Sequence, residues 1–492
     1  MLYLSKSSYC SAVQCPKMLW LRKNKPEAFD ASSMNQAVLD RGNAVGDLAM
    51  GLFGDYVEVP FGELGEMISR TTELINANTP IIAEASFSFN GLFCSVDLLK
   101  NHGDGRVELV EVKSSTKVSD IYLHDVAYQC YVLTQLGYAV ETASLAHINS
   151  GYVRRGALDL QQLFTVEDVT ETVREMQSGV AERVQYLEAY MKQADEPDTG
   201  IGGQCFSPYP CGFFGYCGRD LPNPSIFDVG GIQLRTKLAC FDKGIVSFAD
   251  IEANKAIKPD KMMQVAHELH DLPPQIDTEA IRAFLGKLGY PLYFLDFESF
   301  QPAIPPFDNS SPYEQIVFQY SLHCIAAAGG ELMHSEYLAQ PGEDPRRGVA
   351  EALCRDIMLD ACVLAYNMSF EKGRIKGLAQ LYPDLAGRLM NIHDHIVDLM
   401  VPFQKRQYYS RAMQGSYSIK YVLPALFPDD PELDYHNLQG VHNGTEASAA
   451  FEKMGGMEPE ERRECRENLL KYCGLDTLAM VRVWEKLKEC VQ

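Results

Sequence analysis

The stretch RVELVEVKSST, residues 106–116, has the Val and Leu content of a β-strand and ends in a polar turn. Side chains two residues apart project from the same face of a strand, so Glu111 and Lys113 are expected side by side. GLFCSVDLLKN, residues 91–101, comes just before it and places Asp97 on a neighbouring strand. Two carboxylates beside a lysine are suited to holding Mg²⁺ and to activating water at a phosphate. This part of the chain therefore predicts a sheet that carries a metal site.

Four cysteines have unusual positions on either side of these strands. Cys15 lies in VQCPKMLWL, and Cys205, Cys211 and Cys217 are evenly spaced in QCFSPYPCGFFGYCGRD. The later segment is too rich in Pro, Gly and aromatic residues to be a regular helix or strand, but it could wrap around a metal centre. Four thiolates suit either tetrahedral zinc or an iron–sulfur cluster. Cys10 is the alternative to Cys15, whose Cys-Pro context favours it.

Two further polar residues complete this first pattern. IIAEASFSF contains Glu84 and precedes the Asp97 strand, while DVAYQCYVL contains Gln129 and follows the Glu111 strand as a helical stretch. Over residues 4–220 this order resembles the PD-(D/E)XK nuclease superfamily, in particular its RecB-like branch with a cysteine cluster. CRISPR-associated RecB-like exonucleases and the nuclease domain of AddB are similar.

This resemblance implies a set of site residues. Glu84, Asp97 and Glu111 are the implied metal ligands, Lys113 the catalytic lysine and Gln129 the following helix residue. Cys15, Cys205, Cys211 and Cys217 would hold a [4Fe–4S] cluster, with zinc as the alternative. Relatives often carry a His near RGNAVG, where this chain has Arg41 and Asn43.

A second set of acids lies in the C-terminal part of the chain. In YFLDFESF, residues 293–300, Asp296 and Glu298 share one strand face among apolar neighbours, where ionised groups need partners such as divalent cations. Glu371 follows in LAYNMSFEKGRIKGLA and Asp398 in HIVDLMVPF. The amphipathic stretch LLKYCGLDTLAMVRVWEKL, residues 469–487, places Tyr472 and Asp476 one helical turn apart.

The order of these motifs resembles the DnaQ-like 3′–5′ exonucleases of the ribonuclease H fold. In that family acids hold two metal ions. The resemblance implies Asp296, Glu298, Glu371 and Asp476 as metal ligands, Tyr472 as the residue that orients water, and Asp398 as an additional or substitute ligand. Most members have Asp where this chain has Glu371.

A Pro- and Gly-rich seam, DLPNPSIFDVGG at residues 220–231, separates the two patterns. We expect an α/β protein with a PD-(D/E)XK restriction-endonuclease-like domain at 1–220, a helical linker domain at 221–288, and a ribonuclease H-like domain with a mixed sheet at 289–492. With GSYSIKYVLPALFP between its motifs, nearly the whole chain resembles an uncharacterised bacterial family that joins two such domains.

Composition restricts the classes of function. The chain has 492 residues, of which 46% are hydrophobic and 22% charged, and a net charge of −22. This charge argues against a protein that coats nucleic acid, so any DNA path must be a local basic strip. We expect a cytoplasmic protein without a signal peptide or a membrane span, in which the 14 cysteines are not a disulfide framework.

The leading hypothesis is a nuclease that uses Mg²⁺ or Mn²⁺ to hydrolyse phosphodiester bonds, most simply an exonuclease acting on DNA ends or single strands. It would serve repair, recombination or defence against foreign DNA. One alternative is a catalytically decayed protein with an iron–sulfur cluster that binds nucleic acid or recruits a partner. The other is an exonuclease that processes RNA.

Overall fold

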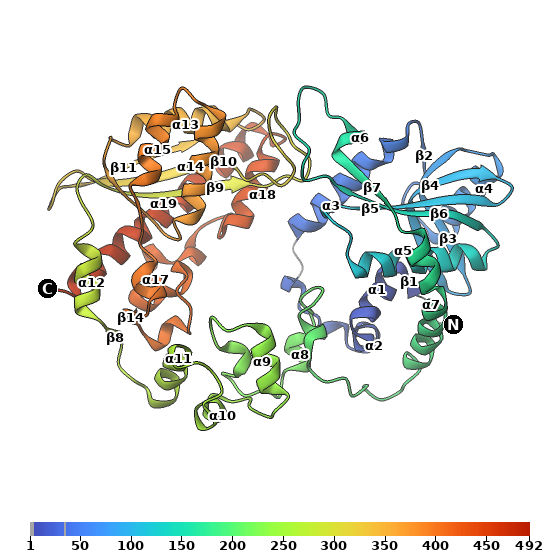
Figure 1. Cartoon of the computed structure of the whole chain (residues 1–492), viewed down its shortest axis with the longest axis horizontal. Helices are drawn as coiled ribbons and strands as arrows, with labels where there is room; N and C mark the ends of the chain where they lie inside the picture. The colour runs from blue at the N-terminus through green and yellow to red at the C-terminus, as the bar shows by residue number, and fades with distance from the viewer. Residues whose placement is uncertain (1–3, 34–35) are drawn as a thin grey trace. The chain divides into compact units, whose positions relative to one another are not determined.

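The computed structural model describes residues 4–33 and 36–492, which divide into two compact units. The first unit comprises the chain up to Asp220 together with Pro302–Glu314, and the second comprises Leu221–Gln301 and Gln315–Gln492. Each unit contains helices and a mixed β-sheet (Figure 1). The α/β class expected from the sequence is confirmed at this level.

The first unit is built on a seven-stranded sheet with the order β2-β3-β4-β5-β6-β7, in which β1 pairs with β4. Strands β3, β4 and β5 are antiparallel neighbours, whereas β5 and β6 are parallel and are joined by helix α5. The strands are β1 (Leu4–Ser5), β2 (Val57–Glu58), β3 (Ile81–Phe89), β4 (Leu92–Gly103), β5 (Arg106–Lys113), β6 (Ala139–Ile148) and β7 (Phe164–Asp168).

Helices cover both faces of this sheet. One face packs against α1, α4, α5 and α7, and the other against α3, α6 and part of residues 302–314. The helices are α1 (Lys6–Gln14), α2 (Pro16–Asn24), α3 (Gln36–Ala49), α4 (Leu64–Asn76), α5 (Asp120–Gln135), α6 (Leu160–Leu163), α7 (Thr170–Tyr190) and α8 (Phe214–Cys217). Helix α1 begins at Lys6 because the side chain of Ser5 accepts a hydrogen bond from the Ser8 amide at 3.2 Å.

The second unit has a five-stranded sheet with the order β11-β10-β9-β12-β13 and a separate two-stranded pair, β14-β8. Strands β9, β10 and β11 are antiparallel neighbours, while β12 runs parallel to β9 and to β13. The strands are β8 (Gln275–Ile276), β9 (Leu292–Phe300), β10 (Ile316–Ile325), β11 (Leu332–Leu338), β12 (Cys362–Ala365), β13 (Ile396–Asp398) and β14 (Tyr408–Tyr409).

Two helical layers enclose the five-stranded sheet. Helices α13, α14 and α15 pack on one face, and α12, α16, α17 and α19 pack on the other; all but α16 are labelled in Figure 1. The helices are α9 (Leu234–Phe241), α10 (Phe248–Asn254), α11 (Pro259–His270), α12 (Thr278–Leu285), α13 (Pro345–Asp356), α14 (Ser369–Leu381), α15 (Ala386–Asp394), α16 (Val401–Gln404), α17 (Ile419–Leu426), α18 (Gly444–Met454) and α19 (Pro459–Glu489). Phe294 of β9 contacts Trp484 of α19 edge to face, so α19 covers the β9 face that also bears Asp296 and Glu298.

This division differs in two ways from the expected segments 1–220, 221–288 and 289–492. Residues 221–288 belong to the second unit, because β8 pairs with β14 and α12 packs in the same core as α19. Residues 302–314, between β9 and β10, belong to the first unit. The sequence did not predict that residues 302–314 belong to the first unit, because this placement depends on their contacts with a distant loop.

Arg154 fastens residues 302–314 within the first unit. Its guanidinium donates hydrogen bonds to the carbonyl oxygens of Pro305 and Pro306 at 3.0 and 2.8 Å. Its backbone amide donates to Ser310 O at 3.0 Å, and Ser310 is fully buried. The hydroxyl of Tyr313 donates to the carbonyl oxygen of Ser114, the residue that follows β5.

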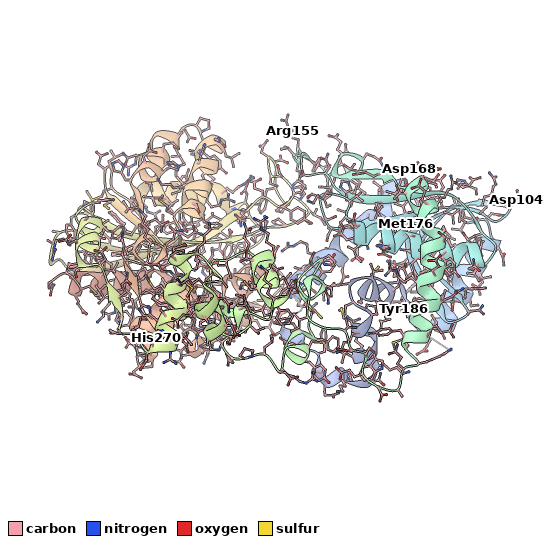
Figure 2. The ribbon with its side chains drawn as sticks, turned by 60° about the horizontal axis from the view of Figure 1, so that its bottom comes forward. Asp104, Arg155, Asp168, Met176, Tyr186 and His270 are labelled. Carbon is pink, nitrogen blue, oxygen red and sulfur yellow. The ribbon has the colours of Figure 1, made fainter. Side chains whose placement is uncertain are left out.

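We predict that Arg154→Ala loosens residues 302–314, because it removes two charge-assisted hydrogen bonds worth roughly 1–3 kcal/mol each. Chymotrypsin should then cut after Phe307 at least several times faster, as followed by mass spectrometry. Arg155→Ala is the matched control, since Arg155 projects into solvent (Figure 2). Equal cleavage rates for the two variants would contradict the anchoring role of Arg154.

Candidate functional site

The first candidate site lies where β5 faces helix α5. Glu111 and Lys113 project from the same face of β5, and the Lys113 ammonium lies 2.7 Å from Glu111 Oε1. Gln129 on α5 donates a hydrogen bond to Glu111 Oε2 at 2.7 Å. Glu111 and Gln129 are both buried. The structure thus brings together three residues that the sequence assigned to one site.

Asp97 lies on β4, the strand next to β5, and Glu84 lies on β3, the strand beyond β4. Asp97 Oδ2 accepts a hydrogen bond from the Val112 amide at 2.7 Å, which fixes the carboxylate next to Glu111. Glu84 has a left-handed backbone with φ of 55° and accepts a hydrogen bond from Ser95 at 3.0 Å. Burial and the charge of Asp97 raise the pKa of Glu84 to about 7.

Two residues of this site were missed in the sequence. The Lys6 ammonium contacts Glu111 Oε1 and Oε2 at 2.9 and 3.0 Å and Asp97 Oδ1 at 3.3 Å. Asp125 on α5 lies 2.7 Å from the Lys113 ammonium and accepts from Gln129 at 2.9 Å. Asp125 could have been found, because it stands four residues before Gln129 on one helix face. Lys6 gave no signal, because it lies far from β5 in the chain.

The two lysines determine what this cluster can do. Burial lowers the pKa of Lys113, but Glu111 and Asp125 outweigh this effect and hold its pKa above the ordinary range. Burial raises the pKa of Glu111, but the two ammonium groups outweigh it and hold that pKa below its usual value. Glu111 is therefore ionised and paired with Lys6 and Lys113, whereas burial and the charge of Glu111 raise the pKa of Asp125. A divalent cation that binds Asp97 and Glu111 together has to displace Lys6.

The second candidate site lies between β9 and α19. Asp296 and Glu298 of β9 face α19, which carries Asp476 and Tyr472. Burial raises the pKa of Asp296 well above its ordinary value, and the charges of Asp476, Glu298 and Glu371 raise it further. The pKa of Glu298 is also raised well above its ordinary value, by burial and by Asp476. Asp296 is affected by the charges of Glu298, Glu371 and Asp476, which indicates that the four acids lie near one another.

Tyr435 is a member of this second site that the sequence did not reveal. Its hydroxyl donates a hydrogen bond to Asp476 Oδ1 at 2.6 Å. Burial nevertheless raises the pKa of Asp476 to about 6, although Tyr435 and the charge of Lys420 act in the opposite direction. Asp296 and Asp476 line a cavity of about 340 Å³ together with Tyr366.

Glu371 and Asp398 differ in how their carboxylates are used. Glu371 lies in the first turn of α14, is 2% exposed, and its Oε2 has no hydrogen-bond partner among the described residues. Burial raises its pKa to about 8. Asp398 instead accepts hydrogen bonds from the backbone amides of Asn367, Met368 and Met400 at 3.0 to 3.3 Å. Asp398 thus positions the start of α14, and Glu371 remains the better candidate ligand.

Three ligand atoms of this site already lie within a metal ion's reach. Within the described part of the chain, Asp296, Glu298 and Cys473 offer atoms that lie within 4.8 Å of one another. Cys473 is fully buried, and burial raises its thiol pKa well above the usual value. Its thiol also donates to the carbonyl oxygen of Asp296 at 3.9 Å. We therefore assign the carboxylates as the candidate ligands and the neutral thiol to packing beneath them.

The four predicted cysteines come together at the other end of α1. Cys15 lies between α1 and α2 and packs in one cluster with Phe213, Cys211 and Cys217. Burial raises the pKa of Cys205, Cys211 and Cys217, and the neighbouring thiols, including Cys15, raise them further. Cys10 lies elsewhere, with its sulfur 4.0 Å from the carbonyl oxygen of Ile121. The structure thus favours Cys15 over Cys10 as the fourth member.

The spacing of these sulfur atoms bears on the kind of centre they would hold. Four thiolates around one tetrahedral zinc ion at about 2.3 Å would lie about 3.8 Å from one another. Among the described residues, the group of ligand atoms within 4.8 Å is that of Asp296, Glu298 and Cys473, and it does not include these cysteines. Zinc and an iron–sulfur cluster are therefore both candidate centres for the four thiols.

Comparisons with known proteins identify similar sequences of unknown function. A family described as a domain of unknown function (DUF2779) matches residues 293–418, which include Asp296, Glu298, Glu371 and Asp398. An uncharacterised protein of Ureaplasma parvum serovar 3, UU173, is 25% identical over 228 residues, which are 42% of this chain. These residues span 32% of that protein, so the chain covers about a third of its length. No solved structure gives a significant match.

A further finding concerns the helices. Over residues 4–33 and 36–492, no helix is both long enough and apolar enough to cross a membrane.

The raised pKa values near 6 for Asp476 and 8 for Glu371 predict a pH dependence. A carboxyl whose pKa is raised by folding stabilises the fold fully below its unfolded pKa, about 4, and loses that contribution as pH rises through its folded pKa. Without divalent cations, the melting temperature should therefore fall by about 3 °C or more from pH 5 to 8. Added Mn²⁺ should reverse the fall at pH 8.

Asp476→Asn should reduce this pH dependence, because the amide does not ionise. Asp394→Asn, at an exposed acid on α15, is the control that should retain it. A wild-type melting temperature that is flat or rising between pH 5 and 8 would show that the acids are not crowded as the structure indicates.

The cysteine arrangement predicts a metal centre that depends on Cys211 and not on Cys10. Anaerobically purified protein should contain iron, and Cys211→Ser should lose it together with the broad absorption near about 400 nm that iron–sulfur centres give. Cys10→Ser should keep both. A colourless wild-type protein with one zinc per chain would replace the cluster by a structural zinc site.

Proposed function

We propose that this protein is a metal-dependent nuclease that hydrolyses phosphodiester bonds, with the carboxylates of the second unit as its principal site. One observation carries the proposal: Asp296, Glu298 and Asp476 are crowded beside a cavity, and their pKa values are raised despite the positive charge of Lys420. Buried acids in this state are stabilised when divalent cations supply the missing positive charge.

The side chains of this site have distinct tasks in such a reaction. Asp296, Glu298, Glu371 and Asp476 would hold Mg²⁺ or Mn²⁺. Bound cations would lower the pKa of water and stabilise negative charge on the departing oxygen. Burial and Asp476 hold the pKa of Tyr472 above its usual value, so its hydroxyl stays protonated and can donate a hydrogen bond to an attacking water. Tyr435 orients Asp476 by the hydrogen bond to Oδ1.

The strand order of the second unit supports the ribonuclease H-like assignment made from the motifs. Its three antiparallel strands come first in the chain, and two parallel strands follow on the other side of β9. The acids lie on β9, α14 and α19, as the resemblance to DnaQ-like exonucleases implies. We therefore propose exonuclease activity on DNA ends or single strands, with RNA as the alternative substrate.

The first unit is proposed as a PD-(D/E)XK, RecB-like domain with a second nuclease site. Strands β3, β4 and β5, followed by α5 and the parallel strand β6, present Glu84, Asp97, Glu111, Lys113 and Gln129 in the implied order. Cys15, Cys205, Cys211 and Cys217 would hold a [4Fe–4S] cluster, as the RecB-like resemblance implies, with zinc as the alternative. With all four positions taken by thiolates, its role would be to join the two ends of the domain.

A second candidate function is a binding protein whose first site no longer hydrolyses nucleic acid. The contacts of Lys6 with Asp97 and Glu111 favour it, because an ammonium group there competes with a divalent cation. In that case the first unit would recognise a strand or a partner protein, and hydrolysis would be confined to the second unit.

The proposal predicts Mn²⁺-dependent cleavage of end-labelled single- or double-stranded DNA by the purified protein, with RNA substrates in parallel. Asp296→Asn should reduce the rate at least about 100-fold, because it removes a metal ligand. Lys113→Met should also reduce the cleavage rate if the first site is active, and it should leave the rate unchanged if the second unit alone hydrolyses DNA. Asp104→Asn, at an exposed turn, is the charge-matched control (Figure 2). Absence of cleavage of every substrate with either Mg²⁺ or Mn²⁺ would refute the proposal.

A further inference from the structure

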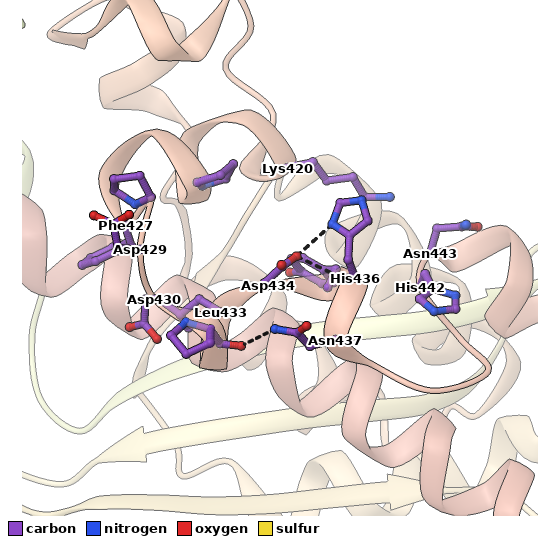
Figure 3. A pocket seen from close by; sticks show the side chains of 14 residues that line it. Lys420, Phe427, Asp429, Asp430, Leu433, Asp434, His436, Asn437, His442 and Asn443 are labelled. Atoms are coloured by element: carbon purple, nitrogen blue, oxygen red, sulfur yellow. Dashed lines mark hydrogen bonds and ion pairs between the residues drawn. The ribbon is translucent and has the colours of Figure 1, made fainter.

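A second cavity in the second unit has a wall formed by the segment between α17 and α18. It has a volume of about 660 Å³ and is lined by residues between Lys420 and Asn443 (Figure 3). It lies outside residues 293–418, so the family match does not extend to it. This volume is in the range of sites for small ligands.

Three residues connect this cavity to the carboxylates. Tyr435 lines the cavity and donates its hydrogen bond to Asp476. Lys420 lines it as well, and its charge acts on both Glu298 and Asp476. Gly444 follows Asn443 of the lining, and a Cβ atom at Gly444 would lie 3.5 Å from Glu298 Oε2. The cavity therefore borders the acids that would hold the metal ions.

The lining has an apolar part and a polar part. Phe427 and Leu433 provide the apolar part together with three prolines: Pro424, Pro428 and Pro431. Lys420 lies across the cavity, in the same part as His436 and Asn443 (Figure 3). Among the described residues, the Lys420 ammonium is in no hydrogen bond or ion pair, although its charge acts on Glu298 and Asp476, and it lines the cavity where a ligand could reach it.

Three acids line the cavity, and the exposed Asp429 lies beside Phe427 and away from Lys420 (Figure 3). Asp434 accepts hydrogen bonds from the His436 amide at 2.9 Å and approaches the His436 ring at 2.8 Å. Asp430 accepts from the Glu432 amide at 3.0 Å and lies near Phe427 in Figure 3. An anionic ligand group would accordingly bind at Lys420, and a flat apolar group would lie against Phe427 and the prolines.

We propose that this cavity binds the terminal nucleotide of a nucleic-acid strand, with a phosphate at Lys420 and the base against Phe427. The inference rests on the proposed nuclease function and adds the residues that receive the strand end. A nucleotide has the required combination of an anionic group and a flat ring, since bases stack on aromatic side chains.

The test measures binding of 2′-deoxyuridine 5′-monophosphate and uridine 5′-monophosphate, which differ only in the 2′-hydroxyl group, by calorimetry, to the full chain in Ca²⁺ buffer. Lys420→Met should weaken binding about tenfold or more, because a charge-assisted hydrogen bond is lost, and Lys420→Arg should restore most of it. Phe427→Ala should weaken binding as well. Lys376→Met, at an exposed lysine of α14, should bind as the wild type does. A stronger effect with one nucleotide identifies the preferred sugar.

Hydrolysis assays with the same variants separate this inference from the nuclease proposal. Lys420→Met should raise KM for a single-stranded oligonucleotide more than it lowers kcat. A wild-type protein that cleaves nucleic acid but fails to bind either mononucleotide, or binds it equally well as Lys420→Met, would overturn the inference and leave the nuclease proposal intact. If the protein binds a mononucleotide in a way that depends on Lys420 but hydrolyses no nucleic acid, the result would support nucleotide binding in the cavity and overturn the nuclease proposal.

Discussion

Buried carboxylates that repel one another are the constraint on which this structure depends. In the first unit Lys6 and Lys113 lie within 3.3 Å of oxygens of Asp97, Glu111 and Asp125 and hold the pKa of Glu111 below its usual value, although burial keeps the pKa of Asp125 raised. In the second unit Lys420 does not offset it, and the pKa values of Asp296, Glu298 and Asp476 stay raised. The second cluster therefore gains more from divalent cations, although the first has the more recognisable motif.

Helix α1 connects two features of the first unit that are distant in the chain. It begins at Lys6, beside Glu111, and ends next to Cys15, where the side chain of Gln14 donates hydrogen bonds to the carbonyl oxygens of Gln204 and Tyr209 at 2.7 Å. A centre held by the four cysteines would fix the end of this helix. It would thereby also fix the position from which Lys6 reaches the carboxylates, so the two sites share one rigid element.

The sequence predicted those site residues whose relation is local. The spacing of Glu111 and Lys113 on one strand, and of Tyr472 and Asp476 on one helix, follows from the periodicity of regular structure. It could not predict Lys6, Tyr435 or the docking of residues 302–314, because each depends on how distant segments pack. The same reason explains why residues 221–288 joined the second unit, as β8 pairs with β14 more than 100 residues later.

We propose that both carboxylate clusters bind metal ions and that the second binds cations more readily. Anomalous diffraction from crystals soaked in Mn²⁺ tests it most directly, since manganese atoms are located without reference to activity. We predict strong peaks beside Asp296 and Asp476, and a weaker one beside Asp97 and Glu111 that coincides with a displaced Lys6 side chain. Crystals that show no manganese at Asp296 and Asp476, with manganese bound elsewhere on the surface, would contradict it.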